Sequence, residues 1–245
     1  VFVFAGQGGQ WPGMGRALYA ERPEFAAVVD RCAAAFVGLV DVDVGAAVRG
    51  ELDAAEFERS DVVQPAQFAT MLGLVAVWQA LGVTPGAVVG HSQGEVAAAV
   101  TAGALELEEG ARVIAERSRR LLACDGAMVA VELGLVEVER ALAGTGLAVA
   151  VVNGPTAVVV AGPGATLAEW MAARVAEGLR CRWLPIGYAA HSEHVEPALP
   201  GLRAALAGLR PGPTRLPFYS TVTGAALAGE QLGAAYWARN AREPV

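Results

Sequence analysis

The sequence predicts an α/β fold in two parts, a large subdomain built on a parallel sheet and a small subdomain inserted into it. Short apolar runs of strand length alternate with longer segments of helical periodicity, which is typical of a parallel sheet covered by helices. Of the 245 residues, 54% are hydrophobic, so the chain can bury a large core. The alternation changes after Asp125-Gly126. We therefore expect the large subdomain over 1–125 and 186–245 and the inserted one over 126–185.

The first half of the large subdomain is expected to contain strands and helices in alternation. Strands are predicted at 2–4 and 87–89, and helices at 23–36, 66–81, 94–102 and 106–122. Gly82 and Gly103 follow two of these helices and are typical helix ends. The last helix has glutamates in its first turn and arginines in its last, which suits the helix dipole. The glycine-rich loop at 6–10 lacks the lysine of a phosphate-binding loop, which argues against nucleotide binding.

The segment 126–185 has the element order of a ferredoxin-like subdomain. The pattern predicts strand 127–133, helix 136–143, strand 147–152, strand 157–161, helix 166–177 and strand 180–184. Asn153-Gly154-Pro155 is a turn signal between two of the strands. The resulting βαββαβ order is the split βαβ motif. The large subdomain then resumes with a helix at 195–209 and a strand at 216–222.

Composition excludes several classes of function. The net charge of −7 argues against a nucleic-acid partner. No apolar run is long enough to cross a bilayer, and the first residues lack the basic segment of a signal peptide. The three cysteines, Cys32, Cys124 and Cys181, fit neither a disulfide framework nor a metal site. We expect a cytoplasmic protein with no membrane partner and no metal.

Residues 90–94, Gly-His-Ser-Gln-Gly, form a G-x-S-x-G motif between a strand and a helix. In such a nucleophile elbow the serine lies on a strained turn at the edge of a hydrolase-like parallel sheet, with its hydroxyl exposed. The backbone N–H after the serine and the field of the following helix stabilise developing negative charge. The motif therefore predicts that Ser92 is a nucleophile, with an ordinary tight turn as the alternative.

Ser92 needs a base, and the chain has three histidines. His191 lies 99 residues after the serine, in the Ser-before-His order of hydrolase-like elbows. His91 adjoins the nucleophile, so its side chain should point away, and His194 is expected at a solvated helix start. Asp125 is the only aspartate between Ser92 and His191. The sequence therefore favours a Ser–His dyad with a backbone carbonyl orienting the imidazole over a Ser-His-Asp triad.

Several stretches in a fixed order resemble one known family. They lie at 4–8, 64–66, 90–95, 116–119, 188–191 and 236–237. Together they are similar to the acyltransferase domain of a modular polyketide synthase, in the superfamily of malonyl-CoA:acyl carrier protein transacylases. The match extends over nearly the whole chain and is far more specific than the elbow alone. Family members normally continue beyond Pro244-Val245 into another helix and strand, so a trimmed or divided domain is expected.

The resemblance implies a role for each matching residue of the dyad. Ser92 would be acylated from an acyl-CoA, and His191 would be its base. The backbone N–H groups of Gln7 and Gln93 would form the oxyanion hole. Asn240 would offer its backbone carbonyl to the His191 ring.

The resemblance also implies how the acyl group is held. Arg117, 25 residues after the serine, would pair with the free carboxylate of a malonyl-type unit, and Gln64 would line the same pocket. A guanidinium binds a carboxylate through two parallel hydrogen bonds, which supports this role. From the residues alone, Arg117 could equally serve the helix dipole, as Arg119 and Arg120 can.

The four residues that end at the histidine predict the acyl selectivity. Malonyl enzymes of the family tend to show His-Ala-Phe-His there and methylmalonyl enzymes Tyr-Ala-Ser-His, whereas this chain has Tyr188-Ala189-Ala190-His191. The stretch 59–66 and Gln93 resemble the methylmalonyl type. Ala190 leaves open the space that a phenylalanine would fill beside the α-carbon of the acyl group. We expect Tyr188 and Ala190 to line the pocket and methylmalonyl to be preferred, with ethylmalonyl or a bulkier unit as the alternative.

The family reaction needs no metal and no bound cofactor, because acyl-CoA is the donor and the phosphopantetheine thiol of an acyl carrier protein the acceptor. The expected partners are therefore acyl-CoA, the carrier protein and neighbouring polyketide synthase domains. The same dyad hydrolyses esters when water reaches the acyl-enzyme, so an α/β-hydrolase or thioesterase is the rival. Arg117 and the inserted subdomain favour transfer. A scaffold module with a decayed site is the third alternative.

Overall fold

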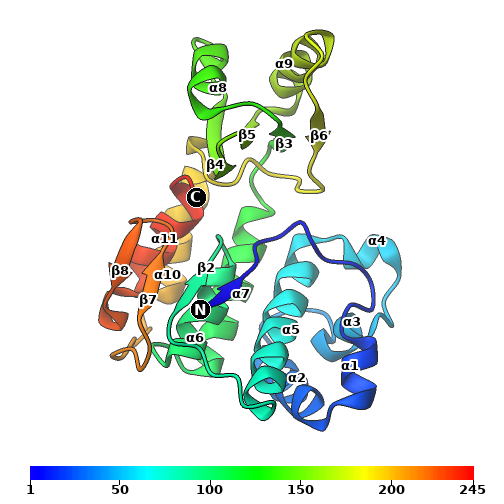
Figure 1. The fold of residues 1–245 in the computed structure, drawn as a ribbon, viewed down its shortest axis with the longest axis vertical. Helices are drawn as coiled ribbons and strands as arrows, with labels where there is room; N and C mark the ends of the chain where they lie inside the picture. The colour runs from blue at the N-terminus through cyan, green and yellow to red at the C-terminus, as the bar shows by residue number, and fades with distance from the viewer.

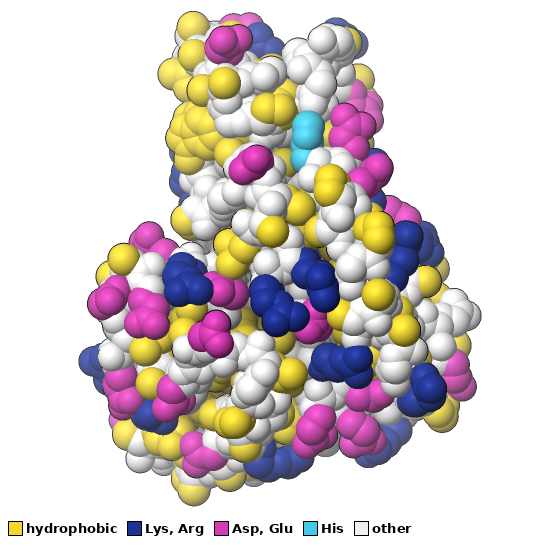
Figure 2. Space-filling view, turned by 180° about the vertical axis from the view of Figure 1, so that it is seen from behind, with side chains coloured by type: hydrophobic (Ala, Val, Ile, Leu, Met, Phe, Trp, Pro, Cys, Tyr) yellow, Lys and Arg dark blue, Asp and Glu magenta, His cyan; other side chains and the backbone are white.

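The computed structural model describes residues 1–245 and shows two parts, a broad lower one and a narrower upper one (Figure 1). Seen from behind, basic and acidic side chains are interspersed over the lower part, and the molecule narrows toward the upper part (Figure 2). No helix is both long and apolar enough to span a membrane.

The lower part is built on a four-stranded sheet in the order β1-β2-β7-β8. The parallel strands are β1 (Phe2–Phe4), β2 (Val88–Gly90) and β7 (Phe218–Ser220), and β8 (Ala225–Leu227) is antiparallel to β7. The predicted parallel strands are confirmed. The predicted strand at 216–222 is shorter than expected, because the chain turns at Gly224 (φ 67°) and folds back as β8. The sequence analysis did not predict β8.

The lower part also contains helices, some beside the sheet and others farther from it (Figure 1). They are α1 (Arg16–Glu21), α2 (Pro23–Phe36), α3 (Val44–Arg49), α4 (Ala54–Phe57), α5 (Ser60–Ala80), α6 (Gly94–Ala102), α7 (Leu107–Leu121), α10 (Leu199–Leu206) and α11 (Ala234–Arg242), with 3₁₀ turns η1 (Glu193–Ala198) and η2 (Gly229–Gln231). The predicted bounds of α2 and α6 are confirmed, whereas α1, α3, α4 and α11 were not predicted.

Two helices differ from their predictions for physical reasons. Helix α5 begins at Ser60 rather than 66 and contains Pro65, because Val62 and Val63 are buried in the core and this packing outweighs the hydrogen bond that proline cannot donate. The segment predicted as one helix at 195–209 is split into η1 and the shorter α10. Pro197, which interrupts regular helical hydrogen bonding, lies inside η1.

The upper part has the predicted βαββαβ element order. Its elements are β3 (Ala127–Val131), α8 (Leu135–Leu142), β4 (Ala148–Gly154), β5 (Ala157–Gly162), α9 (Gly164–Ala176) and β6 (Cys181–Trp183). The strands form an antiparallel sheet in the order β4-β5-β3-β6. The exact subdomain limits of 126 and 185 stay a prediction.

The two faces of this upper sheet have different neighbours. Val129, Val131, Val158 and Val160 point to one face and form a core of their own with α8 and α9. Because side chains alternate along a strand, the residues between them point the other way. Met128, Val151 and Val159 on that second face belong to the core of the lower part, so this face looks toward the sheet that carries Ser92.

The last residues of the chain connect the two parts. After α11 the backbone becomes extended, and Val245 pairs with β4 through the bonds Val152 N–H to Val245 O (2.9 Å) and Val245 N–H to Ala150 O (3.0 Å). These bonds fix the position of the preceding Glu243 backbone.

Candidate functional site

Ser92 lies on a sharp turn between β2 and α6, as the motif predicts. Its φ of 54° is in the left-handed region, which a side chain rarely adopts, so the turn is strained. A Cβ on Gly90 would lie 2.2 Å from the Glu95 amide nitrogen, and a Cβ on Gly94 would lie 2.4 Å from the Phe4 carbonyl oxygen. Both positions therefore require glycine, because the backbone of the elbow is packed directly against its neighbours.

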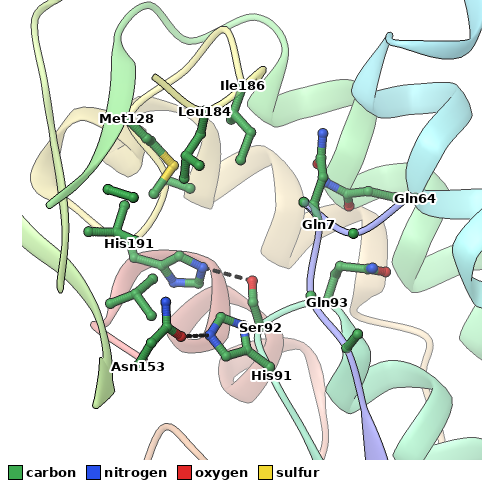
Figure 3. Close-up of a pocket in the computed structure, with 18 of the residues that line it drawn as sticks. Gln7, Gln64, His91, Ser92, Gln93, Met128, Asn153, Leu184, Ile186 and His191 are labelled. Carbon is green, nitrogen blue, oxygen red and sulfur yellow. Dashed lines mark hydrogen bonds between the residues drawn. The ribbon is translucent and has the colours of Figure 1, made fainter. Parts of the chain in front are cut away.

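The structure brings His191 to Ser92. The Ser92 hydroxyl lies 2.7 Å from His191 Nε2 (Figure 3). His191 Nδ1 lies 2.9 Å from the backbone carbonyl oxygen of Glu243. A carbonyl only accepts, so Nδ1 carries the proton and Nε2 is free to accept from the serine hydroxyl. His191 is the second non-glycine residue with positive φ (57°), so both members of the pair sit on strained backbone.

Burial keeps the imidazole neutral. His191 is 3% exposed, and burial together with the nearby charge of Arg117 lowers its pKa to about 3. The hydrogen bond to the Glu243 carbonyl opposes this shift. A neutral imidazole with a free Nε2 is the form that can take a proton from a hydroxyl.

Asn240 does not have the position expected from the resemblance. The acceptor for the His191 ring is the carbonyl of Glu243 rather than that of Asn240. Asn240 lies inside α11, where a carbonyl runs along the helix axis, whereas Glu243 is the first residue beyond the helix and has extended backbone. The Asn240 side chain instead donates to the Ser92 carbonyl (3.2 Å) and to Glu95 (3.1 Å).

The Asn240 amide belongs to a buried network under the elbow. Glu95, which is fully buried, accepts hydrogen bonds from the Thr221 amide and hydroxyl, the Tyr236 hydroxyl and the Asn240 amide. Burial raises the pKa of Glu95 despite these donors. The network joins α6, β7 and α11 directly behind Ser92. Sequence reasoning gave no role to Glu95, although its position three residues after the nucleophile was a signal.

Arg117 points into the site, whereas its neighbours on α7 do not. Its guanidinium donates to Ser92 Oγ (3.0 Å) and to Gln64 Oε1 (3.0 Å). Arg119 and Arg120 instead pair with Glu116 at the helix surface. Of these three arginines, α7 points only Arg117 toward Ser92, which supports a role for it in the site beyond the helix dipole.

Arg117 is a buried cation without a carboxylate partner. It is 2% exposed, its Nε has no acceptor, and burial lowers its pKa. Gln64, which accepts from Arg117, donates to the Tyr188 hydroxyl (3.0 Å), so neutral amide and phenol groups surround the charge. A buried charge is costly when it is unpaired, so this arrangement favours an anionic ligand.

The two backbone N–H groups expected to form the oxyanion hole have no hydrogen-bond acceptor within the chain. The backbone N–H groups of Gln7 and Gln93 donate no hydrogen bond within the chain. The side chain of Gln7 donates to Ser60, and that of Gln93 donates to Gln67. Both acceptors belong to α5, so this helix fixes the positions of both loops. Gln93 immediately precedes α6. Backbone N–H groups at the start of a helix lack acceptors within the helix and can bind an anion.

A cavity of about 340 Å³ joins these groups. Ser92, His191, Arg117 and Gln64 line it from the lower part, together with Gln7, Gln93, Tyr188 and Ala190, all named in the sequence analysis. Met128 and Leu184 contribute apolar surface from the upper part (Figure 3). The site thus lies in a cleft between the two parts of the molecule.

The other two histidines do not contact Ser92 Oγ. His91 Nε2 lies 3.0 Å from Asn153 Oδ1 on β4, across the cleft (Figure 3), and His194 lies near the Gly146 carbonyl. Sequence reasoning missed the His91–Asn153 contact, because Asn153 is 62 residues away and was interpreted only as a turn residue. No group of three or more His, Cys, Asp and Glu side chains is placed to hold a metal ion.

Comparison with known proteins places this geometry in a family. A model of the acyl transferase domain matches residues 1–245. The pikromycin polyketide synthase component PikAII of Streptomyces venezuelae is 48% identical over 249 residues, which cover 100% of this chain and 7% of that protein. The mycoketide-CoA synthase of Mycobacterium tuberculosis is 46% identical over 249 residues, which cover 100% of this chain and 6% of that protein. The chain thus spans less than a tenth of these relatives.

Solved structures agree with the sequence comparison. A loading acyltransferase from the avermectin modular polyketide synthase superposes with a TM-score of 0.96 at 40% identity, over 100% of this chain and 79% of that one. The acyltransferase domain from module 8 of the salinomycin polyketide synthase gives 0.94 at 44% identity, over 100% and 59%. The chain therefore belongs to the acyl transferase domain family and is an acyltransferase of the kind found in modular polyketide synthases.

Proposed function

We propose that this acyltransferase takes an α-substituted malonyl unit, methylmalonyl in the first place, from acyl-CoA onto Ser92 and passes it to the phosphopantetheine thiol of an acyl carrier protein. One observation carries the proposal. The Ser92 hydroxyl lies within hydrogen-bond distance of a neutral imidazole on one side, at 2.7 Å, and of a buried, unpaired guanidinium on the other, at 3.0 Å. The first group activates the hydroxyl, and the second binds a substrate that carries its own carboxylate.

The first half-reaction forms the acyl-enzyme. His191 Nε2 takes the Ser92 proton while Oγ attacks the thioester carbonyl, and the oxygen that becomes negative is stabilised by the N–H groups of Gln7 and Gln93. When the C–S bond breaks, the imidazolium returns the proton to the sulfur and CoA leaves as the thiol. No metal or bound cofactor is needed for any of these steps.

The second half-reaction is the reverse with a different thiol. His191 takes the proton of the carrier-protein thiol, the sulfur attacks the Ser92 ester, and the proton returns to Ser92 Oγ as the C–O bond breaks. The Glu243 carbonyl keeps the Nδ1 proton in place throughout and so fixes the tautomer of the ring.

The three cysteines are free, which supports a reducing compartment such as the cytoplasm.

The rival reading, a serine hydrolase or thioesterase, uses the same dyad with water as acceptor. Such enzymes commonly orient the imidazole with a buried carboxylate. Here the group on His191 Nδ1 is a neutral backbone carbonyl, and the buried Glu95 accepts from Thr221, Tyr236 and Asn240 rather than from the imidazole. The unpaired Arg117 further favours a carboxylate-bearing acyl group over a simple ester.

Intact-protein mass spectrometry tests the proposal directly. After incubation with an equimolar mixture of malonyl-, methylmalonyl- and ethylmalonyl-CoA, we expect a single acyl adduct, chiefly methylmalonyl, which is absent from Ser92→Ala. Addition of a carrier protein bearing phosphopantetheine should move the adduct to that protein. An adduct that only hydrolyses would support the thioesterase, and no adduct from any donor would contradict the proposal.

Ala190→Phe is expected to change the selectivity toward malonyl. Ala190 is 5% exposed and lines the cavity beside Ser92, so a larger ring there fills the space of an α-substituent. One methylene group in a pocket is worth about 1–3 kcal/mol, so the methylmalonyl-to-malonyl ratio of kcat/KM should fall by about 10- to 200-fold. Ala190→Ser is the matched control and should keep the preference. An unchanged ratio in Ala190→Phe would place the α-substituent elsewhere.

A further inference from the structure

One face of α5 carries three buried polar side chains. Ser60, Gln64 and Gln67 are spaced at i, i+4 and i+7, so they lie on the same face of the helix. Each is at most 7% exposed. A helix face turned toward a core is ordinarily apolar, and a buried amide or hydroxyl is costly unless it is hydrogen-bonded. The partners of these three side chains therefore indicate what the polar face is for.

Two of the three residues hold the side-chain amide of Gln7. Ser60 Oγ accepts from Gln7 Nε2 at 3.1 Å, and Gln64 Nε2 donates to Gln7 Oε1 at 3.2 Å. Gln7 and Gln64 lie beside each other in the site (Figure 3). Because both polar atoms of the Gln7 amide are bound, this side chain is fixed in one orientation.

The third residue, Gln67, contacts both loops that carry the expected oxyanion donors. Its Nε2 donates to the Gly6 carbonyl oxygen at 3.3 Å, and its Oε1 accepts from Gln93 Nε2 at 3.1 Å. No backbone N–H donates to the Gly6 carbonyl. Since a carbonyl only accepts, the Gln67 amide must turn its nitrogen toward Gly6, which leaves its oxygen for Gln93.

The Gly6 carbonyl and the Gln7 N–H belong to one peptide group. The group is planar and trans, so its C=O and N–H point in opposite directions. A donor held on the carbonyl oxygen therefore fixes the direction of the Gln7 N–H, which has no acceptor within the chain. The same hydrogen bond polarises the peptide group and makes the N–H a stronger donor.

We infer that Gln67 is a positioning residue for the oxyanion hole. It orients the Gly6–Gln7 peptide and links it to Gln93, whose backbone supplies the second N–H. Gly6, Gln7 and Gln93 line the cavity, whereas Gln67 does not, so Gln67 acts through them. The inference rests on the proposed function, because that function assigns the two N–H groups to the oxyanion.

The oxyanion hole needs such a link because its two donors come from separate segments. Gln7 follows β1, and Gln93 immediately precedes α6. Both N–H groups must meet one oxygen at about 2.7–3.1 Å, so their relative position has to be fixed. The first loop is also packed closely against the elbow, since a Cβ on Gly6 would lie 2.6 Å from His91 Nδ1.

Gln67→Leu tests the inference, because leucine is similar in size and forms neither hydrogen bond. The rate constant for acylation of Ser92 at saturating methylmalonyl-CoA should fall about 10- to 100-fold, less than the roughly 10²- to 10³-fold lost with a whole oxyanion donor. Transfer from Ser92 to the carrier-protein thiol should fall by a similar factor, because both half-reactions form an oxyanion at the same place. Quenched-flow sampling with intact-protein mass spectrometry measures both rates.

Binding without reaction separates positioning from a general structural role. In an unreactive analogue of methylmalonyl-CoA, an N–H replaces the thioester sulfur. Its Kd should be the same for Gln67→Leu and the unchanged enzyme, because interactions that strengthen only in the transition state do not affect ground-state binding. Calorimetry measures this Kd.

Gln67→Glu tests the hydrogen bond to Gly6 through pH. A carboxylate can accept from Gln93 but cannot donate to the Gly6 carbonyl, whereas a protonated carboxyl group can do both. Burial raises the pKa of a carboxyl group, so the acylation rate relative to the unchanged enzyme should rise as the pH is lowered from about 8 toward 5. The same ratio for Gln67→Leu should stay constant.

Gln79→Leu is the matched control, because Gln79 is exposed near the end of the same helix, and it should change neither rate nor Kd. An unchanged acylation rate in Gln67→Leu would overturn the positioning role. A rise in Kd that accounts for the whole loss would also overturn it. If Gln67→Leu does not fold, a ratio for Gln67→Glu that stays flat with pH would overturn it. In each case acylation of Ser92 in the unchanged enzyme would still support the proposed function, whereas its absence there would overturn both.

Discussion

Arg117→Ala is expected to lower kcat/KM for methylmalonyl-CoA by about 100- to 1,000-fold, because two hydrogen bonds from a buried guanidinium to a carboxylate contribute about 1.5–3 kcal/mol each and do not add fully. Propionyl-CoA has no carboxylate, so its slower reaction should change little. The ratio of the two values of kcat/KM is the measurement. The buried, unpaired state of Arg117 is the reason for so large an effect.

Two further variants separate this role from a structural one. Arg117→Lys keeps the charge but loses the planar fork, so it should recover only part of the activity on methylmalonyl-CoA. Arg119→Ala, at the surface of the same helix, should change neither substrate. If Arg117→Ala lowered kcat/KM equally for dicarboxylic and monocarboxylic donors, that result would contradict the role of Arg117 in binding the carboxylate.

His191→Ala is expected to slow acylation of Ser92 by about 10²- to 10⁴-fold, the usual contribution of a general base. The unchanged enzyme should also show an unusual pH profile. Because the pKa of His191 is lowered to about 3 by burial, the base stays neutral far below the ordinary histidine range. We therefore expect kcat/KM for acylation to be flat between about pH 5 and pH 8, where an ordinary histidine would titrate.

The same shift predicts the direction of the pH dependence of stability. Below about pH 6.5 the unfolded chain binds a proton at His191 that the folded chain does not bind, so the free energy of unfolding should decrease as the pH falls from there toward 3.

For the acylation experiment, His194→Ala is the matched control and should leave the acylation rate unchanged. An inflection of kcat/KM near pH 6.5 that disappears in His191→Ala would show that the ring is exposed to solvent during catalysis and would contradict the buried neutral base.

The sequence alone predicted the parts of the site that depend on local spacing. The elbow could be predicted because Gly90 and Gly94 permit a backbone contact that no other residue allows. The βαββαβ order followed from the periodicity of each segment, and the helices α2 and α6 from their proline and glycine boundaries. The pairing of Ser92 with His191 was predicted from chain order and then found at 2.7 Å.

Contacts between distant segments could be decided only by the tertiary structure. The carbonyl that orients His191 belongs to Glu243 rather than Asn240, because the point at which α11 ends determines which carbonyl turns off the helix axis. Which arginine of α7 enters the site depends on how that helix is rotated against α5. The His91–Asn153 contact joins the turn after β2 to strand β4 of the other sheet. Periodicity identifies an element and its buried face, but the relative placement of two elements follows from the packing of the whole core, which no local pattern records.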